Sequence, residues 1–140
     1  MTRVLHILDH SLPLHSGYTF RTRAILKSSQ SAGIEVCGIT GNRHLAQGPP
    51  VETVDGLTFH RTATKLSSPP GLREWQEIEA LRAGIERVAK EWRPDIIHAH
   101  SPALCGMAGL RAARRLGMPF VYEIRAFWED AAVGNGTGSE

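Results

Sequence analysis

Short apolar runs alternate with longer amphipathic segments along most of the chain. Buried strands of a parallel sheet read as nearly continuous apolar runs, whereas a surface helix repeats its apolar positions about every three to four residues. The pattern predicts strands over residues 3–9, 34–40, 95–100 and 120–125. It predicts helices over residues 17–32, 72–92 and 102–116, and each is followed within two residues by a glycine or a proline that ends it.

A hairpin is predicted between the second and third of these strands. Residues 51–54 and 57–62 lie on either side of Asp55-Gly56 and alternate in polarity. A tight two-residue turn needs positive φ angles, which this dipeptide adopts at little cost. The segment 65–71 that follows is rich in serine and proline and is expected to be a linker.

The helix over residues 72–92 has the clearest periodicity. Its apolar positions fall on one narrow face, formed by Ile78, Leu81, Ile85, Val88 and Trp92. Glu86 and Lys90 are spaced for an i,i+4 ion pair, which we expect on the exposed side. In the helix that follows, Ser101 is expected to be the N-cap and Pro102 the first helical residue.

Strands that alternate with amphipathic helices indicate a doubly wound, Rossmann-like α/β fold, in which helices cover both faces of a parallel sheet. We expect a strand order of about 3-2-1-4-5, with the hairpin at the outer edge. Ligands of such sheets bind at the carboxyl ends of the strands, beside the point where the strand order reverses. This rule selects residues 9–17, 98–102 and 123–130 as the candidate site.

Composition narrows the class of protein only a little. With 140 residues, 41% apolar and 21% charged, the chain has the size and composition of one globular domain. Its net charge of +2 does not argue for nucleic-acid binding, which would need a clustered basic stripe. Cys37 and Cys105 lie in apolar surroundings and are expected to be buried, reduced thiols.

The first residues, 1–6, lead directly into a strand-like run and resemble neither a signal peptide nor a membrane span. We therefore expect a cytoplasmic protein. This expectation leaves room for peripheral contact with the inner face of a membrane.

The first chemical motif is Ser16-Gly17-Tyr18, which stands at a predicted helix start. Glycine lets a ligand approach the backbone, and the N–H groups of a first helical turn favour an anion such as a phosphate. A glycine that merely connects loop to helix explains the motif equally well. The sequence is neither G-x-G-x-x-G nor a P-loop, which disfavours dinucleotide binding and P-loop chemistry.

The second motif is His98-Ala99-His100, whose alternation puts both imidazoles on one face at a strand end. The pair is compatible with lining a cleft for a hydroxyl-rich substrate. It is also compatible with one histidine bonded to the backbone and the other partly exposed. A metal site needs a third or fourth ligand. The sequence offers no partner at a recognisable spacing, so no metal is expected.

The third motif places charge at the end of an apolar strand, at Glu123 and Arg125. Buried charges need partners, so these two residues are expected either to form ion pairs or to face a wet cleft. Phe127 and Trp128 follow. Aromatic rings beside polar groups suit a sugar site, although both rings are equally compatible with a core.

Taken together, three stretches resemble the N-terminal domain of glycosyltransferase family 4, of GT-B architecture. The stretches are residues 3–18 (RVLHILDHSLPLHSGY), 93–102 (RPDIIHAHSP) and 119–130 (PFVYEIRAFWED). Within that family they look closest to the exosortase A system-associated glycosyltransferases, which are thought to act in polysaccharide assembly. The family often has two adjacent glycines in the first loop, and here Ser16 replaces one of them.

The resemblance implies the acceptor-binding half of a retaining, metal-independent transferase that uses no cofactor. A nucleotide sugar would bind through a second domain, and the acceptor would be a polysaccharide or a glycolipid. The catalytic residues implied are His100 and Glu123, and the substrate-binding residues are Gly17, Tyr18, His98, Ser101 and Arg125. Glu123 stands where many members have a histidine, and a carboxylate there would hold an acceptor hydroxyl.

The same resemblance implies that residues 1–130 are an incomplete acceptor-side domain and that residues 131–140 are a glycine-rich, truncated tail. We therefore expect the isolated chain to be inactive and to self-associate through the edge of strand 120–125. Two other functions stay open. One is a non-catalytic module that binds a carbohydrate or a protein partner, and the other is a metal-dependent hydrolase built on His98 and His100.

Overall fold

The computed structural model describes residues 2–42, 44, 48–62 and 72–124. In chain order these residues form β1 (Arg3–Leu8), α1 (Gly17–Ser31), β2 (Glu35–Thr40), β3 (Val51–Val54), β4 (Leu57–Arg61), α2 (Leu72–Trp92), β5 (Ile96–His100), α3 (Ala103–Leu116) and β6 (Phe120–Glu123). The expected linker 65–71, the tail 131–140 and Arg125 lie outside the described residues.

The sheet confirms the predicted strand order, with the order β3-β4-β2-β1-β5-β6. Only β3 runs antiparallel, paired with β4 in the hairpin, and the other neighbouring strands of the described sheet are parallel. The hairpin turn forms as expected, with φ angles of 54° at Asp55 and 75° at Gly56. The strand order reverses between β1 and β5, so the predicted switch point lies there.

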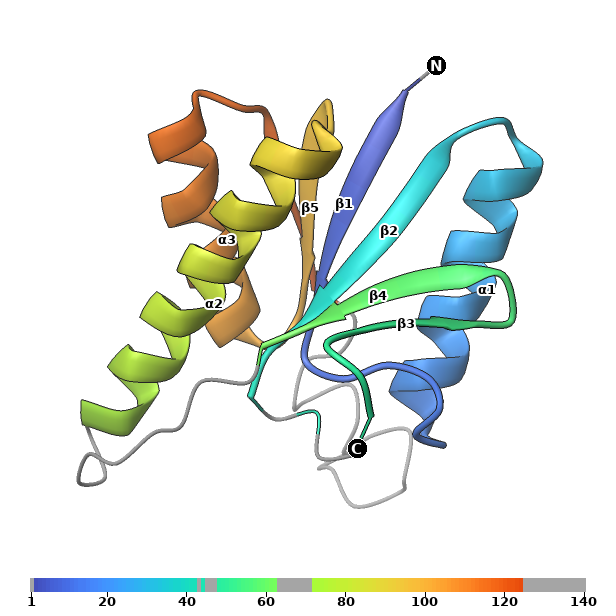
Figure 1. Cartoon of the computed structure of the whole chain (residues 1–140), viewed down its shortest axis with the longest axis horizontal. Helices are drawn as coiled ribbons and strands as arrows, with labels where there is room; N and C mark the ends of the chain where they lie inside the picture. Colours follow the sequence, from blue (N-terminus) through green and yellow to red (C-terminus); the bar gives the residue numbers. More distant parts are fainter. Residues whose placement is uncertain (1, 43, 45–47, 63–71, 125–140) are drawn as a thin grey trace, which may run out of the picture.

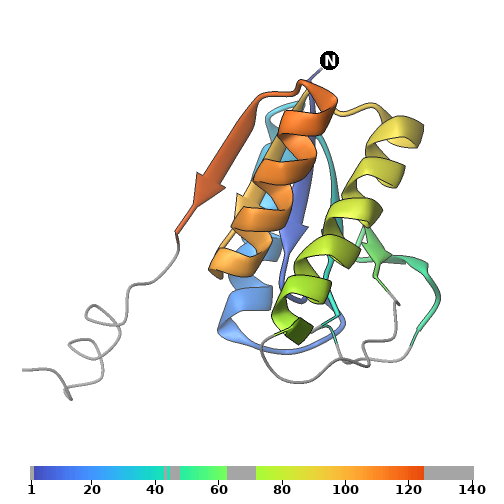
Figure 2. The ribbon, with the colours of Figure 1, turned by 90° about the vertical axis from the view of Figure 1, so that its left-hand side faces the viewer.

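The helices form two layers around this sheet. In Figure 1, α2 and α3 lie on the left of the sheet and α1 lies on the right, beside β2 and the hairpin. Figure 2 shows α2 and α3 side by side on their face of the sheet, with β6 at its margin. This arrangement confirms a doubly wound α/β fold.

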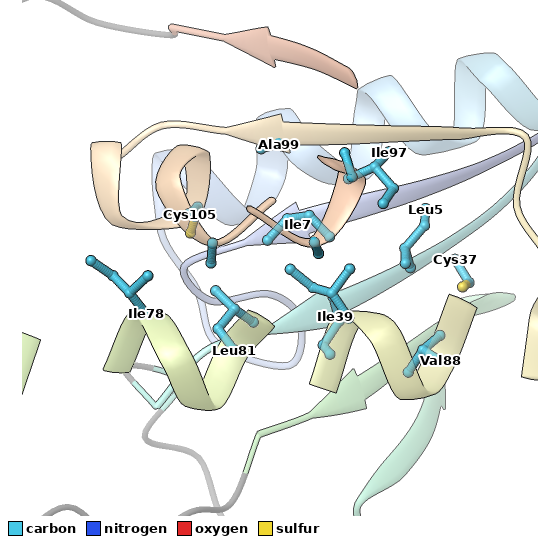
Figure 3. Close-up of a cluster of buried hydrophobic side chains, with 14 residues drawn as sticks. Leu5, Ile7, Cys37, Ile39, Ile78, Leu81, Val88, Ile97, Ala99 and Cys105 are labelled. Carbon is cyan, nitrogen blue, oxygen red and sulfur yellow. The ribbon is translucent and has the colours of Figure 1, made fainter. Parts of the chain in front are cut away.

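A large apolar core fills the space between the sheet and the pair α2 and α3. Ile78, Leu81 and Val88 of α2 face side chains of β1 and β2 across this core (Figure 3). The apolar face of α2 is therefore the one predicted from its periodicity. A smaller core lies under α1, around Leu26 and Phe59.

Helix α3 approaches the sheet closely because the face it buries carries small residues. These buried residues are Cys105, Ala108, Gly109, Ala112 and Ala113. A Cβ on Gly109 would lie 2.8 Å from Cε1 of Phe120, and one on Gly106 would lie 2.6 Å from Cε1 of Tyr122. The helix ends at Gly117, which has a φ of 66° and caps it in the left-handed conformation.

Two local predictions are wrong. The N-cap of α3 is Pro102 rather than Ser101, and no side chain caps the helix there. Glu86 is not on the exposed side of α2 but is only 9% exposed. It forms ion pairs with Arg82 and, at 2.9 Å, with Arg115 of α3, because the packing of α2 against α3 brings that arginine within reach.

Candidate functional site

Four polar side chains meet where β1, β5 and β6 approach their carboxyl ends. In the strand register, His6 of β1 is paired with His98 of β5, and His100 is paired with Glu123 of β6. Successive side chains of a strand point to opposite faces, so His98 and His100 share one face. The sheet thereby confirms that the two histidines of the H-x-H motif lie together, and it adds His6 beside them.

The contacts among these side chains are short. The Nδ1 of His6 lies 2.8 Å from the Nε2 of His100, so the two nitrogens share one proton in a hydrogen bond. The Nε2 of His98 donates to Oε1 of Glu123 at 3.2 Å, and Oε2 of the same carboxylate lies 3.6 Å from the Nδ1 of His100. We call His6, His98 and His100 the histidine cluster.

Burial divides this group into an inner and an outer part. His6 is 2% exposed and His100 is fully buried. The side chains of His98 and Glu123 are 20% and 36% exposed. Glu123 and His98 are therefore the members of this group that solvent reaches, whereas His6 and His100 lie beneath the surface.

A second polar group occupies the loop between β1 and α1. His10 bonds through Nδ1 to Oδ2 of Asp9 at 2.8 Å and through Nε2 to Oγ of Ser16 at 3.0 Å. The same Ser16 hydroxyl caps α1 by accepting the N–H of Thr19 at 3.0 Å. The Tyr18 hydroxyl accepts the N–H of Asp9 at 3.1 Å, so the loop is tied to the first turn of the helix.

Gly17 is the first residue of α1 and is exposed. A Cβ placed on it would meet nothing within 4 Å, and its φ is not positive. Neither packing nor backbone conformation therefore requires glycine at this position. Open space beside the first turn of a helix is compatible with the close approach of an anionic ligand.

A buried arginine fixes this loop to the rest of the sheet. Arg61, at the end of β4, donates to Oγ of Ser11 at 2.6 Å and to the carbonyl oxygen of Leu12 at 2.7 Å. It also forms an ion pair with Glu52 at 2.6 Å, with the two side chains 9% and 18% exposed. Burial lowers the pKa of Arg61, and the hydrogen bond to Glu52 opposes that effect.

His44 lies against the same loop and accepts the N–H of Ser11 through Nδ1 at 3.3 Å. Its Nε2 is buried and has no hydrogen-bond partner among the described residues. Burial, and after it the positive charge of Arg61, lower the pKa of His44 from 6.5 to about 4. The imidazole is therefore neutral in the folded chain near neutral pH.

This lowered pKa predicts a loss of stability in mild acid. Between pH 6.5 and about 4, the unfolded chain binds a proton at His44 that the folded chain does not. The free energy of unfolding should therefore fall as the pH drops through this window. In His44→Gln the free energy of unfolding should depend less steeply on pH. Urea unfolding at three pH values across the window measures this dependence. His15→Gln, at an exposed histidine, is the control, and an unchanged slope in His44→Gln would contradict the prediction.

The cysteines agree with the prediction of buried thiols. Cys37 and Cys105 are both free and buried. Burial raises the pKa of Cys37 from 9.0 to about 12, which keeps its thiol protonated and unreactive.

The structure places most of the predicted site residues at one edge of the sheet. His98, His100 and Glu123 meet, and the backbone N–H of Ser101 donates to the carbonyl oxygen of Glu123 at 2.9 Å. Gly17 and Tyr18 begin α1 near the end of β1. In the loop after β1, Asp9 and His10 bond to each other, and His10 also bonds to Ser16.

Sequence reasoning missed His6 and Arg61. For His6 an indication was available, because it is a polar residue inside an apolar strand that the predicted order places next to the H-x-H strand. Arg61 gave no comparable indication, since its partners at positions 11, 12 and 52 belong to a loop and an outer strand.

An apolar hollow of about 220 Å³ lies elsewhere, between α3 and β6. Its walls are Ala103, Gly106, Met107, Leu110, Phe120 and Tyr122. It offers no acid, base or metal ligand, so we do not assign it to the polar site. Among the described helices, none combines the length and the apolar character needed to cross a membrane.

Comparisons with known proteins identify the family. A family model of the glycosyl transferase 4-like domain matches residues 16–139. A GDP-mannose-dependent alpha-mannosyltransferase of Mycolicibacterium smegmatis is 29% identical over 141 residues, which cover 94% of this chain and 36% of that protein. The chain therefore spans little more than a third of that curated relative.

Two solved structures share the fold at low sequence identity. Sucrose-phosphate synthase from Thermosynechococcus elongatus has a TM-score of 0.62 at 16% identity, over 89% of this chain and 32% of its own. The catalytic domain of starch synthase IV from Arabidopsis thaliana has a TM-score of 0.64 at 15% identity, over 89% and 34% of the two chains. The chain belongs to the glycosyl transferase 4-like domain family and has the fold of the N-terminal half of a GT-B glycosyltransferase.

Proposed function

We propose that this chain is the acceptor-side domain of a retaining glycosyltransferase, which moves a sugar from a nucleotide sugar to a polysaccharide or glycolipid acceptor. The observation that carries the proposal is the partly exposed carboxylate of Glu123, held by His98 at the carboxyl edge of the sheet. Family membership supports sugar transfer as the reaction. The mannosyltransferase relative makes GDP-mannose the first donor to test.

The exposed part of the site is assigned to the acceptor. Glu123 accepts a hydrogen bond from the acceptor hydroxyl, and His98 fixes the carboxylate at 3.2 Å. His100 is fully buried, and its Nδ1 lies 3.6 Å from the second carboxylate oxygen, so we assign it an electrostatic role in positioning Glu123. Ser101 binds the same strand end through its backbone, and Arg125 completes the proposed set.

The donor side is assigned to the start of α1. The N–H groups and the dipole of a first helical turn favour the negative charge that develops on a departing phosphate. Gly17 leaves room for backbone approach, and Tyr18 ties the turn to Asp9. Transfer of this kind needs no metal, because helix N-termini and positive side chains stabilise the leaving group.

The resemblance to exosortase A system-associated enzymes supports a role in polysaccharide assembly. We place the protein in the cytoplasm, in peripheral contact with the inner face of a membrane where lipid-linked acceptors are found. The donor site would be completed by a second domain, as the match to 36% of the mannosyltransferase relative suggests.

The proposal is tested by transfer assays on the full-length gene product, with GDP-mannose first and other nucleotide sugars next. We expect Glu123→Gln to lower kcat/KM for the acceptor by about 100-fold, because a misplaced acceptor hydroxyl loses its oriented approach. Donor binding should change little. The 140-residue chain alone is expected to transfer no sugar, since half a cleft neither positions the donor nor excludes water.

The matched control is Glu35→Gln, which alters an exposed carboxylate at the opposite end of the sheet, where Glu35 pairs with Arg3. Full acceptor kinetics in Glu123→Gln would remove Glu123 from the site. Transfer by the 140-residue chain on its own would show that one domain suffices.

Self-association through β6 follows from its position in the sheet. Within the described part of the chain, β6 pairs with β5 only, so its other edge presents unpaired backbone groups. Apolar side chains are exposed beside it, with Val121 at 46%, Ile124 at 48% and Met107 at 49% exposed. Val121→Lys should therefore reduce association in sedimentation velocity with little loss of stability.

The control for this variant is Val51→Lys. Val51 is 48% exposed on β3, the strand at the other end of the described sheet, so a lysine there changes charge equally without touching β6. Equal relief of association by both variants would contradict an interface at β6. A monomeric wild-type chain with two-state unfolding would favour the alternative of a complete, non-catalytic binding module.

A further inference from the structure

We propose that the histidine cluster binds a zinc-class divalent cation, with Glu123 as the fourth protein group. Three ligand atoms, one from each histidine, lie within 4.8 Å of one another. The H-x-H motif of β5 supplies two imidazoles, and β1 supplies the third at the position in register with His98. This site goes beyond the proposed glycosyl transfer, in which no metal takes part.

The ligand types select the class of cation. Imidazole nitrogen suits zinc and its neighbours in the transition series, whereas magnesium and calcium prefer oxygen ligands. Three histidines with one further position form a known zinc set. The ring nitrogens of His6 and His100, 2.8 Å apart, share one proton, so one of the two presents a lone pair there. A cation at this point takes the place of that proton.

The spacing needs only a small adjustment. Zinc–nitrogen bonds of about 2.0–2.1 Å put two ligands of a tetrahedral ion about 3.3 Å apart. The nitrogens of His6 and His100 lie 2.8 Å apart, and all three ligand nitrogens of the histidine cluster lie within 4.8 Å of one another. The separation that a tetrahedral ion needs falls between these two values. Because β1 and β5 are paired in register, the backbone already fixes where the three side chains begin.

Ring orientation determines which side chain must move. The rings of His98 and His100 stack at 4.5 Å with an angle of 11° between their planes, and those of His6 and His98 stack at 4.9 Å and 29°. A ring lone pair lies in the ring plane, so stacked rings do not aim at one point. His98 is the partly exposed member, at 20%, and is therefore the ring that turns toward the ion.

Glu123 supplies the remaining interaction. Its two oxygens lie 3.2 Å from the Nε2 of His98 and 3.6 Å from the Nδ1 of His100. A carboxylate so placed either takes the fourth position or holds a ligating imidazole in orientation. Both arrangements put a negative charge next to the cation. They also engage the groups assigned above to the acceptor, so the cation and the acceptor would compete.

The experiment uses the 140-residue chain without an affinity tag, titrated with Zn²⁺ by calorimetry and with Co²⁺ by visible absorption. We expect one ion per chain and the intense visible bands of cobalt in a tetrahedral nitrogen site. His98→Gln should abolish binding, and Glu123→Gln should weaken it by about 10- to 100-fold. Mg²⁺ should give no heat.

The control variants use histidines outside the cluster. The chain has 7 histidines, and His15→Gln and His60→Gln remove two that lie elsewhere in the sequence. These variants should bind Zn²⁺ like the wild type. Since His98 is partly exposed, its variant should fold, which a melting curve without metal checks. Zn²⁺ should then raise the Tm of the wild type and not that of His98→Gln.

Absence of a stoichiometric Zn²⁺ complex would overturn the proposal, as would unchanged binding by His98→Gln or loss of binding in either control variant. The readout is metal binding alone. A failure of sugar transfer would therefore not contradict the zinc site, and a failure of zinc binding would not contradict the proposed transferase function.

Discussion

Replacing Arg61 by methionine is expected to lower the free energy of unfolding by about 3–4 kcal/mol. The guanidinium forms an ion pair with Glu52 at 2.6 Å and donates hydrogen bonds to Ser11 and Leu12 at 2.6 and 2.7 Å. Removing one member of a buried pair leaves the other charge desolvated and unmatched. Breaking a buried ion pair usually costs about 3–5 kcal/mol. We expect a value in the lower part of that range, because the Glu52 side chain is still 18% exposed.

A double-mutant cycle separates the ion pair from the loop contacts. Arg61→Met, Glu52→Leu and the double variant are compared by urea unfolding at neutral pH. The double variant should recover part of the loss, because it leaves no unmatched charge, while the contacts to residues 11 and 12 stay broken.

Arg23→Met, at an exposed pair with Asp55, is the control and should cost at most about 1 kcal/mol. An effect of Arg61→Met as small as that control would mean that the loop is fastened by other contacts.

The layers of the fold are predictable from the sequence because each element carries its own local pattern. The apolar face of α2 is readable from its 3.6-residue period, and the hairpin from the Asp55-Gly56 dipeptide, whose φ angles are positive as the turn requires. Strand order then follows from the rules for parallel connections, which leave few topologies for this succession of elements. Both steps depend on neighbours in the sequence or on general topology.

Pairings between distant side chains are not predictable in the same way. Glu86 has a well-spaced partner four residues along α2, yet it bonds to Arg82 and to Arg115 of α3. The rotation of α2 against α3 determines which arginines Glu86 contacts. Residue spacing within α2 does not predict that rotation. The histidine cluster is an intermediate case, since His98 and His100 come from one motif whereas His6 is added by the register of β1 with β5.

The glycines of α3 show a related limit. Inside a helix, glycine costs about 1 kcal/mol relative to alanine, so sequence reasoning treats it as a weakness. In the structure, a Cβ on Gly109 would lie 2.8 Å from Phe120 and 3.2 Å from the Cβ of Ala99. The missing side chain is what lets α3 rest on β5 and β6, at the strands that carry His98 and Glu123.

Gly109→Leu is therefore expected to destabilise the chain by about 3 kcal/mol, at the upper end of the usual cost of overpacking a core. Phe120 can turn aside a little, but the Cβ of Ala99 is fixed to the backbone of β5, so the helix itself must move away. Gly17→Leu is the matched control, because a Cβ there meets nothing within 4 Å and the residue is exposed at the helix start. Chemical denaturation of the two variants gives the comparison. If the distance between α3 and the sheet is set by Gly109, only Gly109→Leu will lose stability, and two variants of equal stability would show that α3 can shift on the sheet without cost.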